Sequence, residues 1–134
     1  MEQDLLQKAT RLMDTGKNGE AKDLFAEILE QEPENAKACN KLGVLFAREN
    51  NLSEAKQYFM RALELNPKFS SAASNLGNIY FETGDLEKAE EYYKKALVLD
   101  PDNPLPYNNL AVIYKKQNKI GDYVKCYKQH VNLK

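Results

Sequence analysis

Three sets of residues recur along the sequence at the same constant spacing, and this period constrains the fold more than any other feature. The residues that share it are the prolines Pro33, Pro67 and Pro101, the turn-forming residues Gly16, Asn50, Gly84 and Asn118, and the leucines Leu42, Leu76 and Leu110. A fixed period of about 20 to 50 residues indicates a repeat protein, in which each repeat is one supersecondary unit that stacks on the next. The sequence therefore divides into four blocks, residues 2–35, 36–69, 70–103 and 104–134.

Each block is predicted to contain two helices separated by a turn. Proline has no amide hydrogen and disfavours helix in the residue before it, so the proline set marks the end of each second helix. Glycine and asparagine tolerate a positive φ, so the turn-forming set marks the end of each first helix. Between these breaks the spacing is helical, as for Leu76, Gly77 and Tyr80. We therefore predict an all-α fold of eight short helices in antiparallel pairs.

Local features refine the predicted helix pairs. Gly43 and Gly77 are small at a position where the two helices of a pair then approach closely. Asn51 and Glu54 have the spacing of a capping box at the start of a helix. Asn103 precedes a proline, which predicts a helix that Asn103 caps and that begins at this proline.

One block carries the residues of a family resemblance in order: Leu76, Gly77, Tyr80, Ala89, Tyr93, Ala96 and Pro101. In order and spacing they closely resemble the tetratricopeptide repeat, and the resemblance covers essentially the whole chain. It implies a right-handed α-solenoid of four tetratricopeptide repeats, residues 2–35, 36–69, 70–103 and 104–134, in one domain that spans residues 1–134. The signature residues build the scaffold, so they do not by themselves specify a ligand.

The terminal blocks depart from the repeat pattern. Lys8 stands where the other blocks have leucine, and Tyr123 and His130 stand where the second and third blocks have alanine. Altered outer faces on terminal repeats keep solenoids soluble. We therefore expect a finished array rather than a fragment of a longer one.

Composition argues against several classes of function. The chain has 19 basic and 20 acidic residues, so it lacks the basic excess that favours binding to nucleic acid or anionic membranes. No apolar run approaches the roughly 20 residues of a membrane span. The first residues lack the basic and apolar regions of a secretory signal. We expect a cytoplasmic protein that binds neither nucleic acid nor membranes.

Candidate catalytic and metal-binding residues are scarce. His130 is the single histidine, which excludes a histidine dyad or a histidine metal cluster. Cys39 and Cys126 lie in different blocks, far apart in the sequence, which predicts two free thiols. Gly16 and Gly19 lack the spacing and the strand context of a phosphate-binding loop. We expect no enzymatic activity, no cofactor and no metal.

The candidate binding site lies on the first helix of each block, opposite the apolar stripe. The resemblance implies that this side lines a concave groove. The predicted groove residues are Lys37, Asn40, Lys41, Val44, Arg48, Ser71, Asn75, Asn78, Phe81, Asn108, Asn109, Val112, Lys115 and Lys116. Amide side chains both donate and accept hydrogen bonds, so a row of them can pair with an extended peptide backbone. The basic side chains favour an acidic or C-terminal segment. The alternative is that these residues are solvated and that the asparagines serve packing.

One ligand class can be checked residue by residue. Related arrays that clamp the terminal carboxylate of chaperone tails use lysine and asparagine in the first repeat, asparagine in the second, and lysine and arginine in the third. The matching residues here are Leu6, Thr10, Lys41, Ser71 and Asn75. A shift by one repeat leaves only Asn75 in agreement. Binding of chaperone tails by that clamp is therefore disfavoured.

Two functions from different classes follow. The first is a protein–protein interaction scaffold that binds a partner peptide or helix in its concave groove. The second is a structural scaffold that associates weakly with itself. Residues 1–35 have a net charge of −5 and residues 104–134 a net charge of +5, so the ends of two chains attract each other head to tail.

Overall fold

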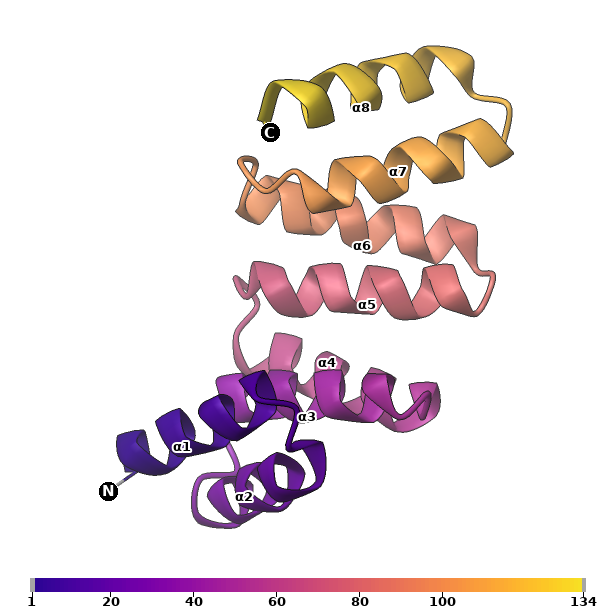
Figure 1. Cartoon of the computed structure of the whole chain (residues 1–134). Coiled ribbons are helices and arrows are strands. Elements are labelled where there is room, and N and C mark those ends of the chain that lie inside the picture. The colour runs from indigo at the N-terminus through magenta and orange to yellow at the C-terminus, as the bar shows by residue number, and fades with distance from the viewer. Residues whose placement is uncertain (1, 134) are drawn as a thin grey trace. The chain divides into compact units, whose positions relative to one another are not determined.

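A computed structural model describes residues 2–133, with the side chains of residues 4–129. The helices are α1 (Glu2–Asp14), α2 (Asn18–Gln31), α3 (Ala36–Arg48), α4 (Leu52–Leu65), α5 (Ser70–Glu82), α6 (Leu86–Leu99), α7 (Leu105–Lys116) and α8 (Ile120–Leu133). Over the described range there is no strand, and the two helices of each pair, α1 with α2, α3 with α4, α5 with α6 and α7 with α8, run antiparallel (Figure 1). The predicted all-α fold of paired helices is confirmed. None of the described helices is long and apolar enough to cross a membrane.

The turns within the pairs have the backbone conformation that the sequence predicts. Gly16, Asn50, Gly84 and Asn118 adopt φ values of 81°, 61°, 88° and 59°. Each residue follows the end of the first helix of its pair. Glycine has no Cβ, and asparagine bonds locally to the backbone, so both enter this left-handed region at low cost. The turn-forming residues therefore recur because the first helix of every pair ends at the same repeat position.

Two of the predicted helix starts differ from the structure. Asn51 precedes α4, but its side chain makes no capping hydrogen bond, so the predicted capping box is wrong. The Oδ1 atom of Asn103 accepts from the amide of Leu105 at 3.2 Å, although α7 begins one residue later than expected. Side-chain caps are found instead at Asn35, which accepts from the amide of Ala38, and at Asp85. The capping pattern thus predicts roughly where a helix begins. It does not predict whether the side chain forms a capping hydrogen bond, because that depends on the local backbone conformation.

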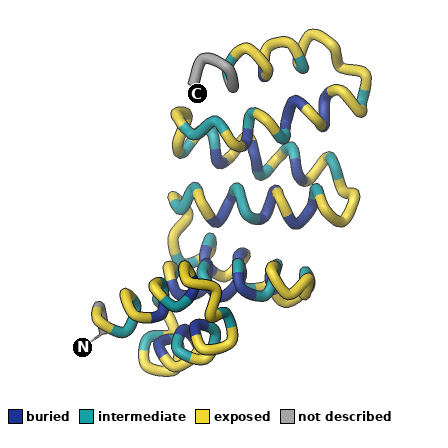
Figure 2. The backbone as a smooth tube through the Cα atoms, viewed as in Figure 1, coloured by how far each residue is buried: buried dark blue, intermediate teal, exposed yellow. Residues whose placement is uncertain are grey.

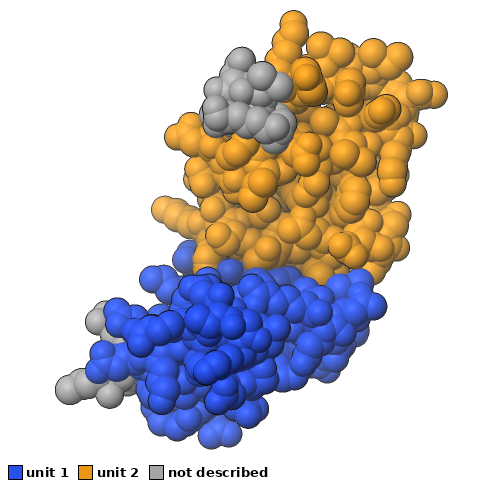
Figure 3. Space-filling view, in the orientation of Figure 1, with its two compact units in different colours: residues 1–67 blue, residues 68–134 orange. Residues whose placement is uncertain are grey.

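The contacts divide the chain into two compact units, residues 1–67 and residues 68–134 (Figure 3). Unit 1 contains α1 to α4, and unit 2 contains α5 to α8. Each unit has two helix pairs and its own buried residues (Figure 2). The expectation of a single domain over residues 1–134 stays a prediction.

In unit 1, α3 packs against both helices of the preceding pair. The core that forms there contains Phe25, Ile28 and Leu42, which are almost completely buried. Gly43 on α3 faces the ring of Phe59 on α4, and a Cβ atom at Gly43 would lie 2.5 Å from that ring. The expected close approach of α3 and α4 is confirmed, because only glycine leaves room for the aromatic ring.

Unit 2 repeats this packing with different side chains. A Cβ atom at Gly77 on α5 would lie 2.7 Å from the ring of Tyr93 on α6. Leu76, Tyr93 and Ile113 are fully buried, and α7 packs on α6. Cys126 on α8 is buried and, like Cys39 in unit 1, carries a free thiol, as predicted. The side chain of His130 lies outside the described residues.

Candidate partner-binding surfaces

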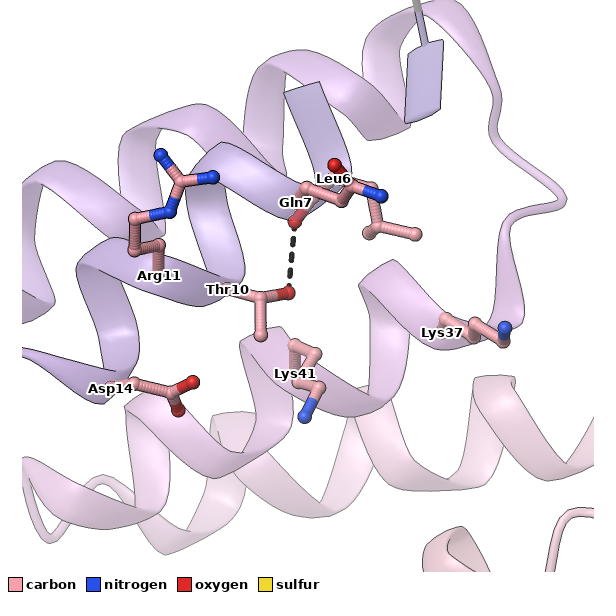
Figure 4. A pocket seen from close by; sticks show the side chains of 7 residues that line it. All are labelled: Leu6, Gln7, Thr10, Arg11, Asp14, Lys37 and Lys41. Atoms are coloured by element: carbon pink, nitrogen blue, oxygen red, sulfur yellow. Dashed lines mark hydrogen bonds between the residues drawn. The ribbon is translucent and has the colours of Figure 1, made fainter. Parts of the chain in front are cut away.

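A cleft of about 460 Å³ opens between α1 and α3 in unit 1 (Figure 4). The residues that line it are Leu6, Gln7, Thr10, Arg11, Asp14, Lys37 and Lys41. Those from α1 follow the spacing of a helical face, and the two lysines stand one turn apart on α3. Helical periodicity therefore brings one face of each helix to the same cleft. We call it the α1–α3 cleft.

The chemistry of the α1–α3 cleft is mainly cationic. Arg11, Lys37 and Lys41 carry positive charge, and Asp14 is the one acidic side chain among the lining residues. The Thr10 hydroxyl donates to the carbonyl oxygen of Leu6 at 2.8 Å, so its proton is used within the helix and its oxygen can still accept. The cleft is therefore suited to an anionic group such as a carboxylate.

The other predicted groove residues of unit 1 have different surroundings. Arg48 donates from its Nη1 atom to the carbonyl oxygen of Met13 at 3.2 Å and to Oδ1 of Asn18 at 2.9 Å. Arg48 therefore ties the end of α3 to the α1–α2 turn. Asn40 is buried, and Val44 is half-buried against the core. Only Lys37 and Lys41 of the predicted residues line the α1–α3 cleft.

In unit 2, two predicted asparagines meet on one tyrosine. Tyr93 on α6 donates its hydroxyl proton to Oδ1 of Asn78 on α5 at 2.5 Å. The Nδ2 atom of Asn109 on α7 donates to the same Oδ1 and to the Tyr93 hydroxyl, both at 3.1 Å. Burial raises the pKa of Tyr93 to about 12, despite the hydrogen bond from Asn109 that lowers it. The three side chains link three consecutive helices, and we call them the Asn–Tyr–Asn network.

A second cleft, of about 530 Å³, lies between α7 and α8. Its lining residues are Asn108, Ala111, Val112, Lys115, Lys116, Tyr123 and Tyr127. Asn108, Val112 and the two lysines among them were predicted as groove residues. Nearby, the Lys116 ammonium lies 5.4 Å from the ring centroid of Phe81, within the range of a cation–π interaction. This α7–α8 cleft is thus partly apolar and partly basic.

Ser71 and Asn75 complete the predicted groove residues on α5. Ser71 is exposed and Asn75 is half-buried. Neither residue lines one of the two clefts. The structure therefore gathers the predicted residues of unit 2 mainly on α7, around Asn108, Val112 and the two lysines.

Glu90 on α6 is an acidic side chain with two close partners. Its Oε2 atom lies 2.8 Å from the ammonium of Lys94 and accepts from the Tyr114 hydroxyl at 2.8 Å. Burial raises the pKa of Glu90, but these hydrogen bonds outweigh it, and the pKa is lowered overall. Burial, together with the hydrogen bond to Glu90, raises the pKa of Tyr114 to about 12. The group ties α6 to α7 and keeps Glu90 ionised. Among the described residues, no three His, Cys, Asp or Glu side chains are placed to hold a metal ion.

Sequence reasoning missed several of the residues that line the clefts, Arg11, Tyr123 and Tyr127 among them. Tyr127 stands one period after Tyr93, so extending the aromatic set by one block finds it. Tyr123 stands where the second and third blocks have alanine, which marks a terminal repeat but does not predict a cleft. Arg11 has no basic counterpart at this position in the other blocks, and only the placement of α3 beside α1 shows its position.

Comparison with protein families identifies the repeat. A model described as "Tetratricopeptide repeat" matches residues 12–77 and 46–94, and a second, described as "TPR repeat", matches residues 77–118. Together these matches cover well over half of the chain. Among curated proteins, no sequence matches this one.

Solved structures agree on the fold. A crystal structure of MamA is 23% identical, with a TM-score of 0.89 over 98% of this chain and 77% of its own. A MamA fragment from Desulfovibrio magneticus RS-1 is 20% identical, with a TM-score of 0.80 over 99% of this chain and 73% of its own. The first TPR of Spaghetti (RPAP3), bound to the HSP90 peptide SRMEEVD, is 25% identical, with a TM-score of 0.82 over 87% of this chain and 93% of its own. The chain is a protein-interaction scaffold and belongs to the tetratricopeptide repeat family.

Proposed function

We propose that the α1–α3 cleft binds an acidic segment of a partner protein. The observation that carries this proposal is the set of three cations, Arg11, Lys37 and Lys41, around a cleft with one lining carboxylate. Charges at the edge of an interface speed encounter and select the partner more than they add affinity. Binding is therefore modest in strength, selective for acidic partners and sensitive to salt.

The asparagines of unit 2 are proposed to hold the backbone of a bound peptide. In the Asn–Tyr–Asn network, the Nδ2 group of Asn78 and the Oδ1 atom of Asn109 lie outside the three hydrogen bonds described. They are one donor and one acceptor, which is what an extended backbone can pair with. Asn75 and Asn108 lie on the same two helices. Because Asn78 and Asn109 also bond to Tyr93, their substitution changes folding as well as binding.

The solved RPAP3 repeat supports a peptide ligand in a similar fold. That protein is bound to SRMEEVD, a peptide with three acidic side chains. The carboxylate clamp is not matched in this chain, where Leu6 and Thr10 stand at its first two positions. We therefore propose recognition of acidic side chains, with the terminal carboxylate as one further anion and not as the obligatory contact.

The test uses fluorescein-labelled SRMEEVD as a probe, read by fluorescence anisotropy. Two further probes are the same peptide with an amidated C-terminus and a peptide with lysine in place of the acidic residues. The acidic and amidated peptides should bind with similar affinity, and the lysine peptide should not bind. Substitution of both Lys37→Glu and Lys41→Glu should weaken binding by about tenfold, because it reverses two charges of the cleft.

The matched control replaces two exposed lysines that line neither cleft, Lys17→Glu and Lys95→Glu. This variant has the same change in net charge and should keep most of the affinity. Equal losses in the two variants would mean that overall charge, and not the α1–α3 cleft, attracts the peptide. Unchanged binding in the Lys37 and Lys41 variant would place the site elsewhere.

Self-association is the second candidate function. It is supported by the opposite net charges of residues 1–35 and 104–134, −5 and +5. Head-to-tail contacts of this kind build open chains rather than closed dimers. Sedimentation at high concentration should show association at low salt that disappears as salt is added. A monomer under both conditions excludes this function.

We also propose that the chain acts in the cytoplasm, without a catalytic activity, metal or cofactor of its own. The support is compositional: one histidine, two distant cysteines and a near-neutral net charge. Fractionation of source cells with an antibody against the chain tests the location.

A further inference from the structure

The aromatic residue of the second helix in each pair is buried in three repeats and exposed in the fourth. Phe25, Phe59 and Tyr93 are 0%, 2% and 0% exposed, whereas Tyr127 at the same repeat position is 55% exposed. Within unit 2, the helix that follows Tyr93 accounts for part of the difference, because Asn109 of α7 bonds to the Tyr93 hydroxyl. Tyr127 has the same repeat position on α8 but is exposed.

Tyr127 belongs to an apolar surface on α8. Ile120 is 72% exposed, Val124 is also exposed, and the spacing of these residues with Tyr127 is that of one helical face. The rings of Tyr123 and Tyr127 stack with centroids 6.3 Å apart. Residues 120–129 of α8 are drawn mostly as exposed in Figure 2. An exposed apolar surface of this kind indicates an interaction site.

The α7–α8 cleft resembles the surface on which a helix packs in the preceding repeat. Val112 and Tyr127 line it, and they stand one period after Asn78 and Tyr93. On those earlier residues a helix already lies, because α7 places Asn109 against both side chains. In the next repeat, the apolar Val112 stands at the position that the polar Asn78 has here. The occupant is therefore expected to be helical and to present an apolar group here.

The charge of the surface selects an acidic occupant. Lys115 and Lys116 line the cleft, and Lys119 follows in the turn to α8. Residues 104–134 contain six basic residues and one acidic residue, Asp122. Complementary charge gives such an interface its orientation and its preference among partners.

A second copy of the chain fits this surface poorly. On α1, the helix that would continue the stack, Lys8 stands where other repeats have leucine, and Arg11 follows one turn later. Among the described side chains of residues 4–67, Met60 is the one large apolar residue that is exposed. Pairing of two α8 helices would bring lysines together. A second copy thus offers negative charge in residues 1–35 but no apolar face for Tyr127.

We propose that the face of α7 and α8 around Tyr127 binds an amphipathic, acidic helix of a partner protein. The apolar side of that helix lies against Val112, Val124 and Tyr127, and its acidic side lies toward Lys115 and Lys116. The proposal rests on the proposed scaffold function and names the partner class for the C-terminal repeat. It concerns a surface separate from the α1–α3 cleft.

The probe is a synthetic fluorescein-labelled helical peptide with leucines at i, i+3, i+4 and i+7 and glutamates on the opposite face. A second peptide has the same composition with two central prolines, which prevent a helix. Anisotropy should show binding of the first peptide and little binding of the second. Tyr127→Ser should weaken binding by about tenfold, as expected when a central aromatic contact is lost. Lys115→Gln with Lys116→Gln should reduce the salt dependence, because it removes two positive charges from the cleft.

The matched control is Val98→Ser on α6, which removes an apolar side chain that is 81% exposed and lines neither cleft. Its affinity should equal that of the parent, and circular dichroism should show all variants folded. The Lys37→Glu and Lys41→Glu variant should bind the helical peptide normally, so that failure of the two sites is distinguishable. Equal binding of the proline peptide, or unchanged affinity in Tyr127→Ser, overturns the proposal. The proposal is also overturned if Tyr127→Ser weakens binding to phosphatidylserine vesicles but not binding to the helical peptide.

Discussion

Tyr93 and Asn109 are joined by a hydrogen bond of 3.1 Å from the side-chain amide of Asn109 to the tyrosine hydroxyl. The same hydroxyl donates to Asn78, so one oxygen connects α5, α6 and α7. Asparagines that the sequence suggests for ligand binding thus also hold neighbouring helices together. The packing role and the proposed binding role would share these side chains, because an amide has more donors and acceptors than the network uses.

Removing the Tyr93 hydroxyl should therefore destabilise the fold. Tyr93→Phe keeps the buried ring against Gly77 but leaves Asn78 and Asn109 without their shared partner. We expect a loss of about 1 to 2 kcal/mol in the free energy of unfolding, measured by urea denaturation. Tyr92→Phe is the control, since Tyr92 is half-buried and stacks on Tyr80. Equal stability of the Tyr93 and Tyr92 variants would show that the network contributes nothing.

The same tyrosine predicts a pH dependence. The pKa values of Tyr93 and Tyr114 are raised from 10.0 to about 12, in each case first by burial. The folded state therefore holds these protons more tightly than the unfolded state does. Their contribution to stability is fully present below pH 10 and is lost as the pH rises from 10 to about 12. Below pH 10 the contribution of these two groups to the free energy of unfolding should not change with pH.

Urea denaturation at a series of alkaline pH values measures this dependence. Tyr93→Phe should lose stability less steeply than the parent between pH 10 and about 12, because one of the two groups is gone. Ultraviolet absorbance of tyrosinate in the folded protein gives an independent titration. Identical alkaline profiles for the parent and the Tyr93→Phe variant would contradict the assignment.

The elements that the sequence predicted best are those fixed by the backbone. Gly84 and Asn118 were placed at helix ends because few residues tolerate positive φ, and both adopt it. Side-chain partners were harder to predict. The hydrogen bond between Asn78 and Asn109 depends on the placement of α7 on α5 and α6, which no local pattern contains. Asn51 shows the same limit, since its capping spacing is correct but its side chain makes no cap.

In the candidate site, too, the sequence predicts positions on a helical face better than it predicts contacts between helices. Lys37 and Lys41 were predicted from their position on a helical face, and the structure places them in a cleft. The partnership of this face with Arg11 requires α1 to lie beside α3. Asn40 was also predicted for the groove, yet it is buried. A helix face defined by period alone has an uncertainty of one residue position, which is enough to turn a side chain from the surface into the core.

The close approach of paired helices gives a prediction for Gly77. A Cβ atom there would lie 2.7 Å from the Tyr93 ring, so Gly77→Ala forces the ring or the helix to move. We expect the free energy of unfolding to fall by about 1 to 3 kcal/mol, despite the better helix propensity of alanine. Gly121→Ala on α8 is the control, because a Cβ atom at Gly121 would have no atom within 4 Å. Thermal unfolding of the two variants compares them directly, and a stabilised Gly77→Ala would exclude the tight contact.

The single-domain organisation predicted from the repeat is tested by Leu76→Ala. Leu76 is fully buried on α5, and truncating a buried leucine costs about 2 to 5 kcal/mol. If residues 1–134 unfold as one domain, amide hydrogen exchange should lose protection equally in the slowest amides of residues 1–67 and of residues 68–134. Leu42→Ala in unit 1 is the reciprocal variant and should have the same global effect. Loss of protection confined to residues 68–134 in Leu76→Ala would show that the two units unfold separately. A Leu76→Ala variant as stable as the parent would contradict its place in the core.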